Sequence, residues 1–100
     1  MAAYLLAQVE VHDPDTYATY LPLAHASIVA AGGRYIARGG HIEVLEGEVP
    51  RRAVIVEFPS RQAALEWYHG PAYTHARAIR QRASTGRLCI IDGVDEVPLE

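Results

Sequence analysis

The sequence contains no lysine, one cysteine, one methionine and one phenylalanine. A single cysteine, Cys89, excludes a disulfide bond within the chain, and its place in the apolar run 88–91 predicts a small buried side chain. No apolar run approaches the roughly 18 residues that a membrane span needs. The net charge of -3 favours neither nucleic acid nor an anionic membrane as a partner. Together these absences favour a cytoplasmic protein.

The size and composition predict one domain with one core. The chain has 100 residues, of which 50% are hydrophobic and 21% are charged, and these values are ordinary for a globular protein. We assign residues 1–93 to the domain and residues 94–100 to a polar tail. All 9 basic residues are arginine. This pattern fits either anion recognition or the base composition of a genome, and the second explanation is the simpler one.

The first third of the chain predicts a strand followed by a helix. Residues 4–11 alternate between an apolar face and a mixed face, as in a strand of a sheet that is covered on both sides. Asp13-Pro14-Asp15 supplies an N-cap, a first helical residue and an acidic first turn. Buried positions then recur at helical spacing over residues 17–31. Pro22 predicts a kink or a restart of this helix, and Gly32-Gly33 ends it.

The middle of the chain predicts two or three strands. Residues 34–38 form a strand with Arg34 and Arg38 on the same side, and residues 42–46 are also extended. Gly39-Gly40 between them fits either a two-residue hairpin turn or a bulge in one long strand. Residues 52–58 are apolar almost throughout, which predicts a central strand.

The last third predicts two helical segments and a final strand. Ser60 caps a helix over residues 61–69, and Gly70-Pro71 ends it and begins a second helix. Residues 84–86 end the second helix, and residues 87–91 form the last strand. The resulting order predicts an α+β protein, a ferredoxin-like βαββαβ protomer whose antiparallel sheet carries the helices on one face. The other face would expose apolar side chains, so we expect a homodimer with its sheets packed face to face.

Several blocks of residues resemble one known family. They are Asp13-Pro14 with Tyr17 and Tyr20, Gly32-Gly33-Arg34-Tyr35, Arg38-Gly39-Gly40, Leu45-Glu46-Gly47, Glu57-Phe58-Pro59-Ser60, and Trp67-Tyr68 with Tyr73. Between residues 4 and 93 the chain resembles a small uncharacterised family, a domain of unknown function within the dimeric α+β barrel superfamily. The resemblance implies a protomer whose sheet joins a second copy to form a barrel. Superfamily members include cofactor-independent monooxygenases, haem-degrading monooxygenases, lactone isomerases and polyketide cyclases, and their ligands usually lie between helices and sheet.

Arginine and aromatic side chains are the candidate ligand-binding groups. The guanidinium groups of Arg34 and Arg38 offer paired donors to a carboxylate or phenolate, although they could equally pair with acidic residues at the sheet surface. The aromatic residues of the helices could line a pocket or simply fill the core. We predict that Arg38 is catalytic and that the ligand-binding residues are Tyr17, Tyr20, Arg34, Trp67, Tyr73 and Arg77.

The five histidines show no spacing typical of a metal site. We therefore predict no metal and no cofactor. His25 borders the buried stripe of the first helix and is the best candidate for a general base, though a structural role fits it as well. The prediction for function is a dimer that binds a small aromatic or carboxylate-bearing molecule, with or without cofactor-independent oxygenation, isomerisation or cyclisation. The alternative is a non-catalytic sensor, carrier or stress-related dimer.

Overall fold

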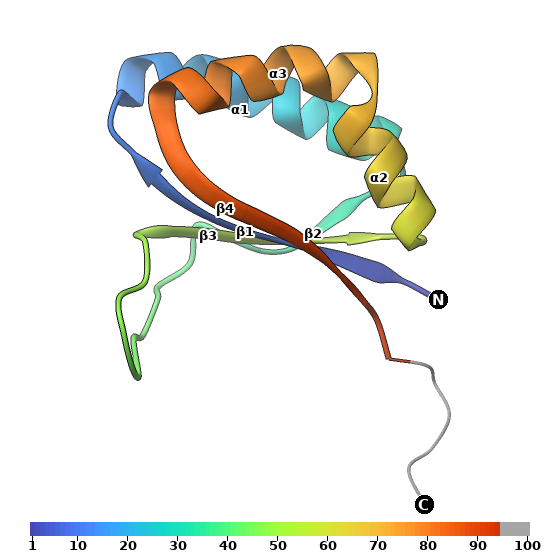
Figure 1. Ribbon diagram of the computed structural model, residues 1–100, viewed down its shortest axis with the longest axis horizontal. Coiled ribbons are helices and arrows are strands. Elements are labelled where there is room, and N and C mark those ends of the chain that lie inside the picture. Colours follow the sequence, from blue (N-terminus) through green and yellow to red (C-terminus); the bar gives the residue numbers. More distant parts are fainter. Residues whose placement is uncertain (95–100) are drawn as a thin grey trace, which may run out of the picture.

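The computed structural model describes residues 1–94, and these residues form one four-stranded sheet covered by three helices (Figure 1). The elements are β1 (Ala3–Val11), α1 (Pro14–Ala30), β2 (Arg34–Arg38), β3 (Arg52–Phe58), α2 (Arg61–His69), α3 (Pro71–Ala83) and β4 (Ser84–Asp92). The strands pair antiparallel in the order β2-β3-β1-β4. This is the ferredoxin-like arrangement that the sequence predicted. Apart from Val94, the predicted tail of residues 94–100 lies outside the described residues.

The sheet has a covered face, which lies under the helices, and an open face on the opposite side. Side chains alternate between the two faces along β1, so Leu5 is buried on the covered face while Leu6 is half-buried on the open face. The antiparallel register extends this alternation, because Val56 pairs with Leu5 and Ile55 pairs with Leu6. Val56, Phe58 and the helical Tyr73 are fully buried and form the centre of the core.

Asp13 starts α1 as predicted. Its carboxylate accepts hydrogen bonds from the backbone N–H of Thr16 at 3.2 Å and from the Thr16 hydroxyl at 2.7 Å, and these bonds lower the pKa of Asp13. The helix then continues without interruption past Pro22 to Ala30, so the restart predicted at Pro22 does not occur. Pro22 is exposed, and the carbonyl that it leaves without a helical partner is on the solvent side of the helix.

A β-bulge in β2 corrects the prediction that two arginines share one side of the strand. The register of β2 against β3 shifts by one residue around Ile36. Arg34 consequently pairs with Glu57 on the open face, whereas Arg38 pairs with Val54 on the covered face. The strict alternation assumed from the sequence fails here because the bulge inserts one unpaired residue.

The glycines that follow β2 form neither a hairpin turn nor a bulge. Gly39 has a φ of 71° and ends the strand, and the bulge lies upstream of it. Residues 42–46 form no strand, so of the two or three strands predicted for the middle of the chain the structure contains two, β2 and β3. Residues 39–51 instead form one loop, which extends below the sheet on the side of the open face (Figure 1).

The last strand begins earlier than predicted. β4 starts at Ser84, directly after α3, rather than at Arg87. The Ser84 backbone is already extended, and its hydroxyl donates a hydrogen bond to the carbonyl oxygen of Arg80 at 2.6 Å. This bond satisfies a terminal carbonyl of the helix without a separate turn.

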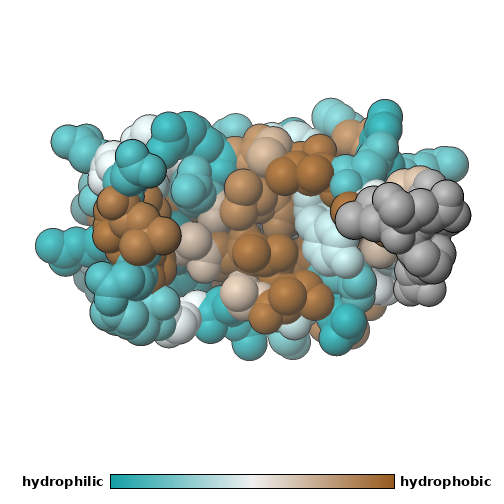
Figure 2. Space-filling model, turned by 90° about the horizontal axis from the view of Figure 1, so that it is seen from below, coloured by the Kyte–Doolittle hydropathy of each residue, from teal (hydrophilic) through white to brown (hydrophobic). Residues whose placement is uncertain are grey.

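Apolar side chains gather at the centre of the open face (Figure 2). The register places half-buried Leu6 and Ile55 there, together with exposed Cys89 and Ile91. Within the single chain Cys89 is therefore exposed, contrary to the prediction. Neighbouring Leu88 lies on the covered face, and strand alternation directs Cys89 to the other side.

Candidate functional site

A cavity of about 200 Å³ lies between the covered face of the sheet and the helices. Its floor is formed by apolar side chains of β1, β3 and β4, including Leu5, Val9, Val56 and Leu88. Its polar and aromatic lining consists of Tyr17, Tyr20, Tyr35, Arg38, Arg52, Trp67, Tyr73 and Arg80. The described lining residues include no aspartate or glutamate. Every charged lining group is therefore an arginine.

Arg38 and Tyr35 of β2 form the exposed rim of the cavity. The guanidinium carbon of Arg38 lies 3.9 Å from the centre of the Tyr35 ring. The imidazole of His25, on α1, stacks on the same ring with 5.6 Å between centroids and 5° between planes. Nδ1 of His25 is 3.5 Å from Nη1 of Arg38. His25 thus adjoins the rim through Arg38 and Tyr35 but is not part of the lining.

Arg52, at the start of β3, brings a second guanidinium to the cavity. Its carbon Cζ lies 5.2 Å from the centre of the Tyr17 ring. Burial raises the pKa of the Tyr17 hydroxyl, and the nearby positive charge of Arg52 opposes part of that rise. The Nε atom of Arg52 is buried, and it has no hydrogen-bond partner among residues 1–94. Arg52 therefore lines the cavity and carries a buried donor that residues 1–94 leave without an acceptor.

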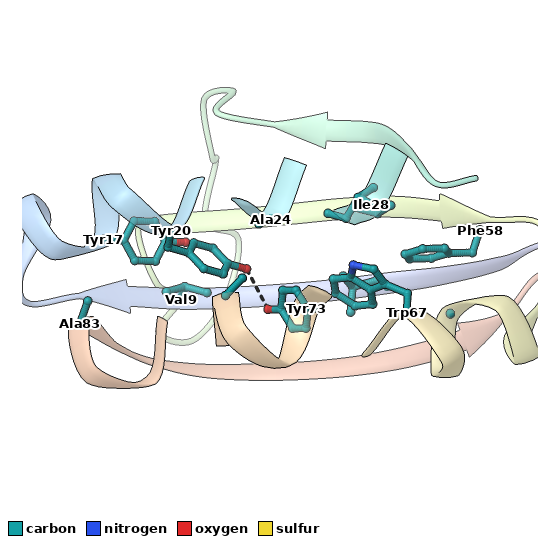
Figure 3. Close-up of a cluster of buried hydrophobic side chains, with 13 residues drawn as sticks. Val9, Tyr17, Tyr20, Ala24, Ile28, Phe58, Trp67, Tyr73 and Ala83 are labelled. Atoms are coloured by element: carbon teal, nitrogen blue, oxygen red, sulfur yellow. Dashed lines mark hydrogen bonds between the residues drawn. The ribbon is translucent and has the colours of Figure 1, made fainter. Parts of the chain in front are cut away.

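Arg80 of α3 supplies the third guanidinium, deep in the protein. Only 5% of its surface is exposed, and no carboxylate within the described part of the chain pairs with it. Its Nε donates a hydrogen bond to the hydroxyl oxygen of Tyr73 at 3.2 Å. The Tyr73 hydroxyl in turn shares a hydrogen bond of 2.8 Å with the Tyr20 hydroxyl (Figure 3). Burial is the main cause that raises the pKa of Tyr20, so its phenol stays neutral.

Trp67 of α2 closes one end of the cavity. Its indole N–H donates to the hydroxyl of Ser27 on α1 at 2.9 Å, which satisfies the one polar atom of the ring. The indole lies close to the Tyr73 ring, with 4.1 Å between centroids, and also contacts Phe58 (Figure 3). Trp67 and Tyr73, with their ring planes 34° apart, offer an aromatic wall to whatever occupies the cavity.

The fold brings most of the predicted site residues together. Five line the cavity, and His25 lies beside its rim; the five are Tyr17, Tyr20, Arg38, Trp67 and Tyr73. Arg34 and Arg77 do not line it. Arg34 is on the open face, where its Nε donates to Glu57 at 2.9 Å, and Arg77 stacks on Tyr68 with its guanidinium carbon 4.7 Å from the ring centre.

Sequence reasoning missed Arg52, Arg80 and Tyr35 as site residues. A signal for Arg52 was present, because strand alternation places it on the same face as Val54 and Val56. Arg80 falls seven residues after Tyr73, two helical turns further along the same stripe. A charged residue on an apolar face of either element was the clue.

Within residues 1–94, no three side chains of histidine, cysteine, aspartate or glutamate are grouped so that they could hold a metal ion. None of the helices in this range has the length and apolar character needed to cross a membrane.

The sheet order and the helices on one face define a ferredoxin-like α+β protein. The sequence narrows this class further. Residues 2–94 match the family described as a domain of unknown function, DUF1330, and the chain belongs to that family. None of the curated proteins matches the sequence.

Solved structures share the fold. A protein of unknown function from Rhodopseudomonas palustris is 25% identical, with a TM-score of 0.73 over 94% of this chain and 83% of that chain. A dimeric ferredoxin-like protein of unknown function from Jannaschia is 10% identical, with a TM-score of 0.72 over 93% of this chain and 100% of that chain. The cofactor-independent oxygenase SnoaB from Streptomyces nogalater is 12% identical, with a TM-score of 0.63 over 98% of both chains.

Proposed function

We propose that this protein binds a small molecule with one apolar ring and one carboxylate, or a comparable anionic group, in the cavity between helices and sheet. The observation that carries the proposal is the charge of the lining: Arg38, Arg52 and Arg80 face the cavity, and the described lining holds no carboxylate. Of the three, Arg80 is buried, and within residues 1–94 it has the Tyr73 hydroxyl as an acceptor but no counter-charge, which is costly for a buried cation. A bound anion would supply that counter-charge and further acceptors. The unpartnered Nε of Arg52 adds a specific place for a ligand oxygen.

The size of the cavity limits the ligand to a single ring. A cavity of roughly 150 Å³ lined by apolar side chains can hold benzene. The present cavity, at about 200 Å³, leaves room for a ring and a small substituent. The wall formed by Trp67 and Tyr73 suits a planar ring, because aromatic rings pack favourably in offset or edge-to-face arrangements.

Binding is better supported than turnover. The titratable side chains of the described lining are arginines and tyrosines, and burial raises the pKa of Tyr17 and Tyr20, so neither is a base near neutral pH. A reaction in this cavity would rely on the reactivity of the ligand itself, with His25 at the rim as the nearest imidazole. Catalysis is the second candidate function, because the fold is similar to that of a cofactor-independent oxygenase.

Calorimetric titration with benzoate and with its neutral counterpart benzamide tests the binding proposal. We expect benzoate to bind at least about tenfold more tightly, because one charge-assisted contact is worth roughly 1.5–3 kcal/mol. Arg52→Gln and Arg38→Gln should weaken benzoate binding. Arg34→Gln is the matched control, since Arg34 belongs to the same strand as Arg38 but faces away from the cavity. Equal affinity for the two probes, or an equal loss in all three variants, would contradict the proposal.

We also propose a homodimer whose two open faces pack together. Half-buried Leu6 and Ile55 and exposed Ile91 leave an apolar patch on this face (Figure 2), and structural neighbours are described as dimeric. Val44 and Leu45 are exposed on the loop that extends on the same side, where they could flank a second copy (Figure 1).

Analytical ultracentrifugation tests the assembly. Ile55→Glu should convert the dimer to a monomer, because it buries an unpaired carboxylate at the centre of the interface. Leu23→Glu is the control, since Leu23 is 39% exposed on α1 and lies away from the sheet. A wild-type protein that sediments as a monomer at micromolar concentration would refute the dimer.

A further inference from the structure

A pair of tyrosine hydroxyls lies deep in the cavity, where water has little access. Tyr73 is fully buried and Tyr20 is 8% exposed, and their oxygens are 2.8 Å apart (Figure 3). The rings come from different helices, Tyr20 from α1 and Tyr73 from α3. The Tyr73 hydroxyl also accepts a hydrogen bond from the Nε–H of Arg80 at 3.2 Å. The three polar groups therefore form one hydrogen-bonded series.

The hydrogen bonds among Arg80, Tyr73 and Tyr20 leave one hydroxyl proton without an acceptor. Two hydroxyls carry two protons, and the contact between Tyr20 and Tyr73 uses one of them. If Tyr73 donates to Tyr20, the proton of Tyr20 is free; if Tyr20 donates to Tyr73, the proton of Tyr73 is free. No other side chain or backbone atom within residues 1–94 accepts a hydrogen bond from either hydroxyl. Because Tyr73 is fully buried, the O–H that could meet a ligand is that of Tyr20, which is free when Tyr73 donates to Tyr20.

Arg80 favours donation from Tyr73 to Tyr20, because a hydroxyl that accepts a hydrogen bond becomes a better donor. A guanidinium can only donate, so Tyr73 must accept from it, and the bond pulls electron density away from the phenol oxygens. Hydrogen bonds connected in this way strengthen one another in a low-dielectric site. Burial raises the pKa of Tyr20, so the protons stay in place near neutral pH. The remaining O–H is a polarised donor that suits an oxygen acceptor.

We propose that the Tyr20–Tyr73 pair binds a second oxygen of the ligand, which makes the ligand a ring compound with both a carboxylate and a hydroxyl or carbonyl oxygen. This inference rests on the proposed function, because it assigns the carboxylate to Arg52 or Arg38 nearer the rim. The two polar ends are separated by the Tyr17 ring, which lies 5.2 Å from Cζ of Arg52 and 5.2 Å from the Tyr20 ring centre. A ring compound with a carboxylate on one carbon and an oxygen on another would present one group to each polar end. Hydroxybenzoates are the simplest members of the class.

Calorimetric titration of benzoate and the three hydroxybenzoate isomers against the wild-type protein is the first test. We expect at least one isomer to bind about fivefold more tightly than benzoate, because one neutral hydrogen bond is worth about 1 kcal/mol. If no isomer exceeds benzoate, the inference is overturned, and a water molecule on the free O–H explains the result. If benzoate itself does not bind, the proposed function fails, and the two failures are thereby distinguished.

The double variant Tyr20→Phe/Tyr73→Phe is the second test, because a single variant still leaves one hydroxyl that can donate. It should lose the preference for the hydroxybenzoate, measured as the ratio of the two dissociation constants in the same variant, so that any change shared by both ligands cancels. Binding of benzoate also shows that the variant is folded. Tyr68→Phe is the matched control, since Tyr68 packs against Trp67 and Tyr73 but does not line the cavity. A double variant that keeps the full preference, or a control that loses it, would overturn the inference.

Discussion

The arginines on the two faces of the sheet differ in whether a carboxylate pairs with them, although β2 places one arginine on each face. On the open face, the charge of Arg34 is met by Glu57, whose carboxylate also accepts a hydrogen bond from the Tyr4 hydroxyl at 3.1 Å. On the covered face, Arg38, Arg52 and Arg80 converge on one cavity, and no carboxylate there meets them. Within residues 1–94, the open-face Arg34 thus has a carboxylate partner, whereas the three arginines of the cavity have none. The difference separates a structural ion pair from a candidate binding site.

The two faces should differ most in how much the free energy of unfolding falls when a large apolar side chain is truncated to alanine. Phe58→Ala on the covered face should lower the free energy of unfolding by about 3–5 kcal/mol, because Phe58 is fully buried. Ile55→Ala on the open face should cost about 1 kcal/mol in dilute protein, since that side chain is only half-buried within one chain. Urea denaturation measures both. Equal losses would mean that the open face is as well packed as the covered face.

Replacing a glycine by alanine, which adds one carbon, should change the free energy of unfolding by less, and by different amounts at Gly33 and Gly40. A Cβ at Gly33 would lie 2.8 Å from Cγ2 of Ile28 and 3.0 Å from Cε1 of Phe58. Gly33→Ala should therefore destabilise the protein by about 1–3 kcal/mol through overpacking beneath α1. Gly40→Ala, in the loop after β2, meets no atom within 4 Å and should have little effect. Thermal unfolding of both variants checks the contrast, and a neutral Gly33→Ala would show that the covered face is loosely packed at this point.

Replacing an arginine by methionine should change the free energy of unfolding in opposite directions on the two faces. Arg80→Met should raise the free energy of unfolding by about 1 kcal/mol, because a buried cation without a carboxylate is replaced by an apolar side chain. Arg34→Met should lower it by about 0.5 kcal/mol through loss of an exposed ion pair. Chemical denaturation in the absence of ligand distinguishes the two. A loss of stability in Arg80→Met would identify Arg80 as a structural contact.

The smallest effect concerns the titration of tyrosines. The hydrogen bond to Glu57 raises the pKa of Tyr4 on the open face, whereas burial raises the pKa of Tyr20 on the covered face. Glu57→Gln should therefore return the pKa of Tyr4 toward its usual value and leave Tyr20 unchanged, as followed by NMR of each ring. Because a raised pKa favours the neutral phenol in the folded state, this contribution to stability is complete below about pH 10 and is lost at higher pH. A parallel change at Tyr20 would contradict the assignment of burial as its cause.

Much of the architecture was predictable because it depends on local patterns. The Asp13 cap, the alternation along β1 and the apolar run of β3 each act over a few residues, and the structure contains all three. The early start of β4 and the missing strand at residues 42–46 were not predictable in this way. Both depend on which backbone groups find partners in the assembled sheet.

The sequence by itself determined the ferredoxin-like fold and the aromatic side chains that line the cavity, because helical and strand periodicity place those side chains on the buried faces. Only the tertiary structure decided which arginines belong to the cavity. The bulge at Ile36 moved Arg34 away from Arg38, and strand pairing and helix packing brought Arg52 and Arg80 to the same space. Periodicity indicates which residues share a face of one element, whereas a binding site depends on which faces of different elements meet.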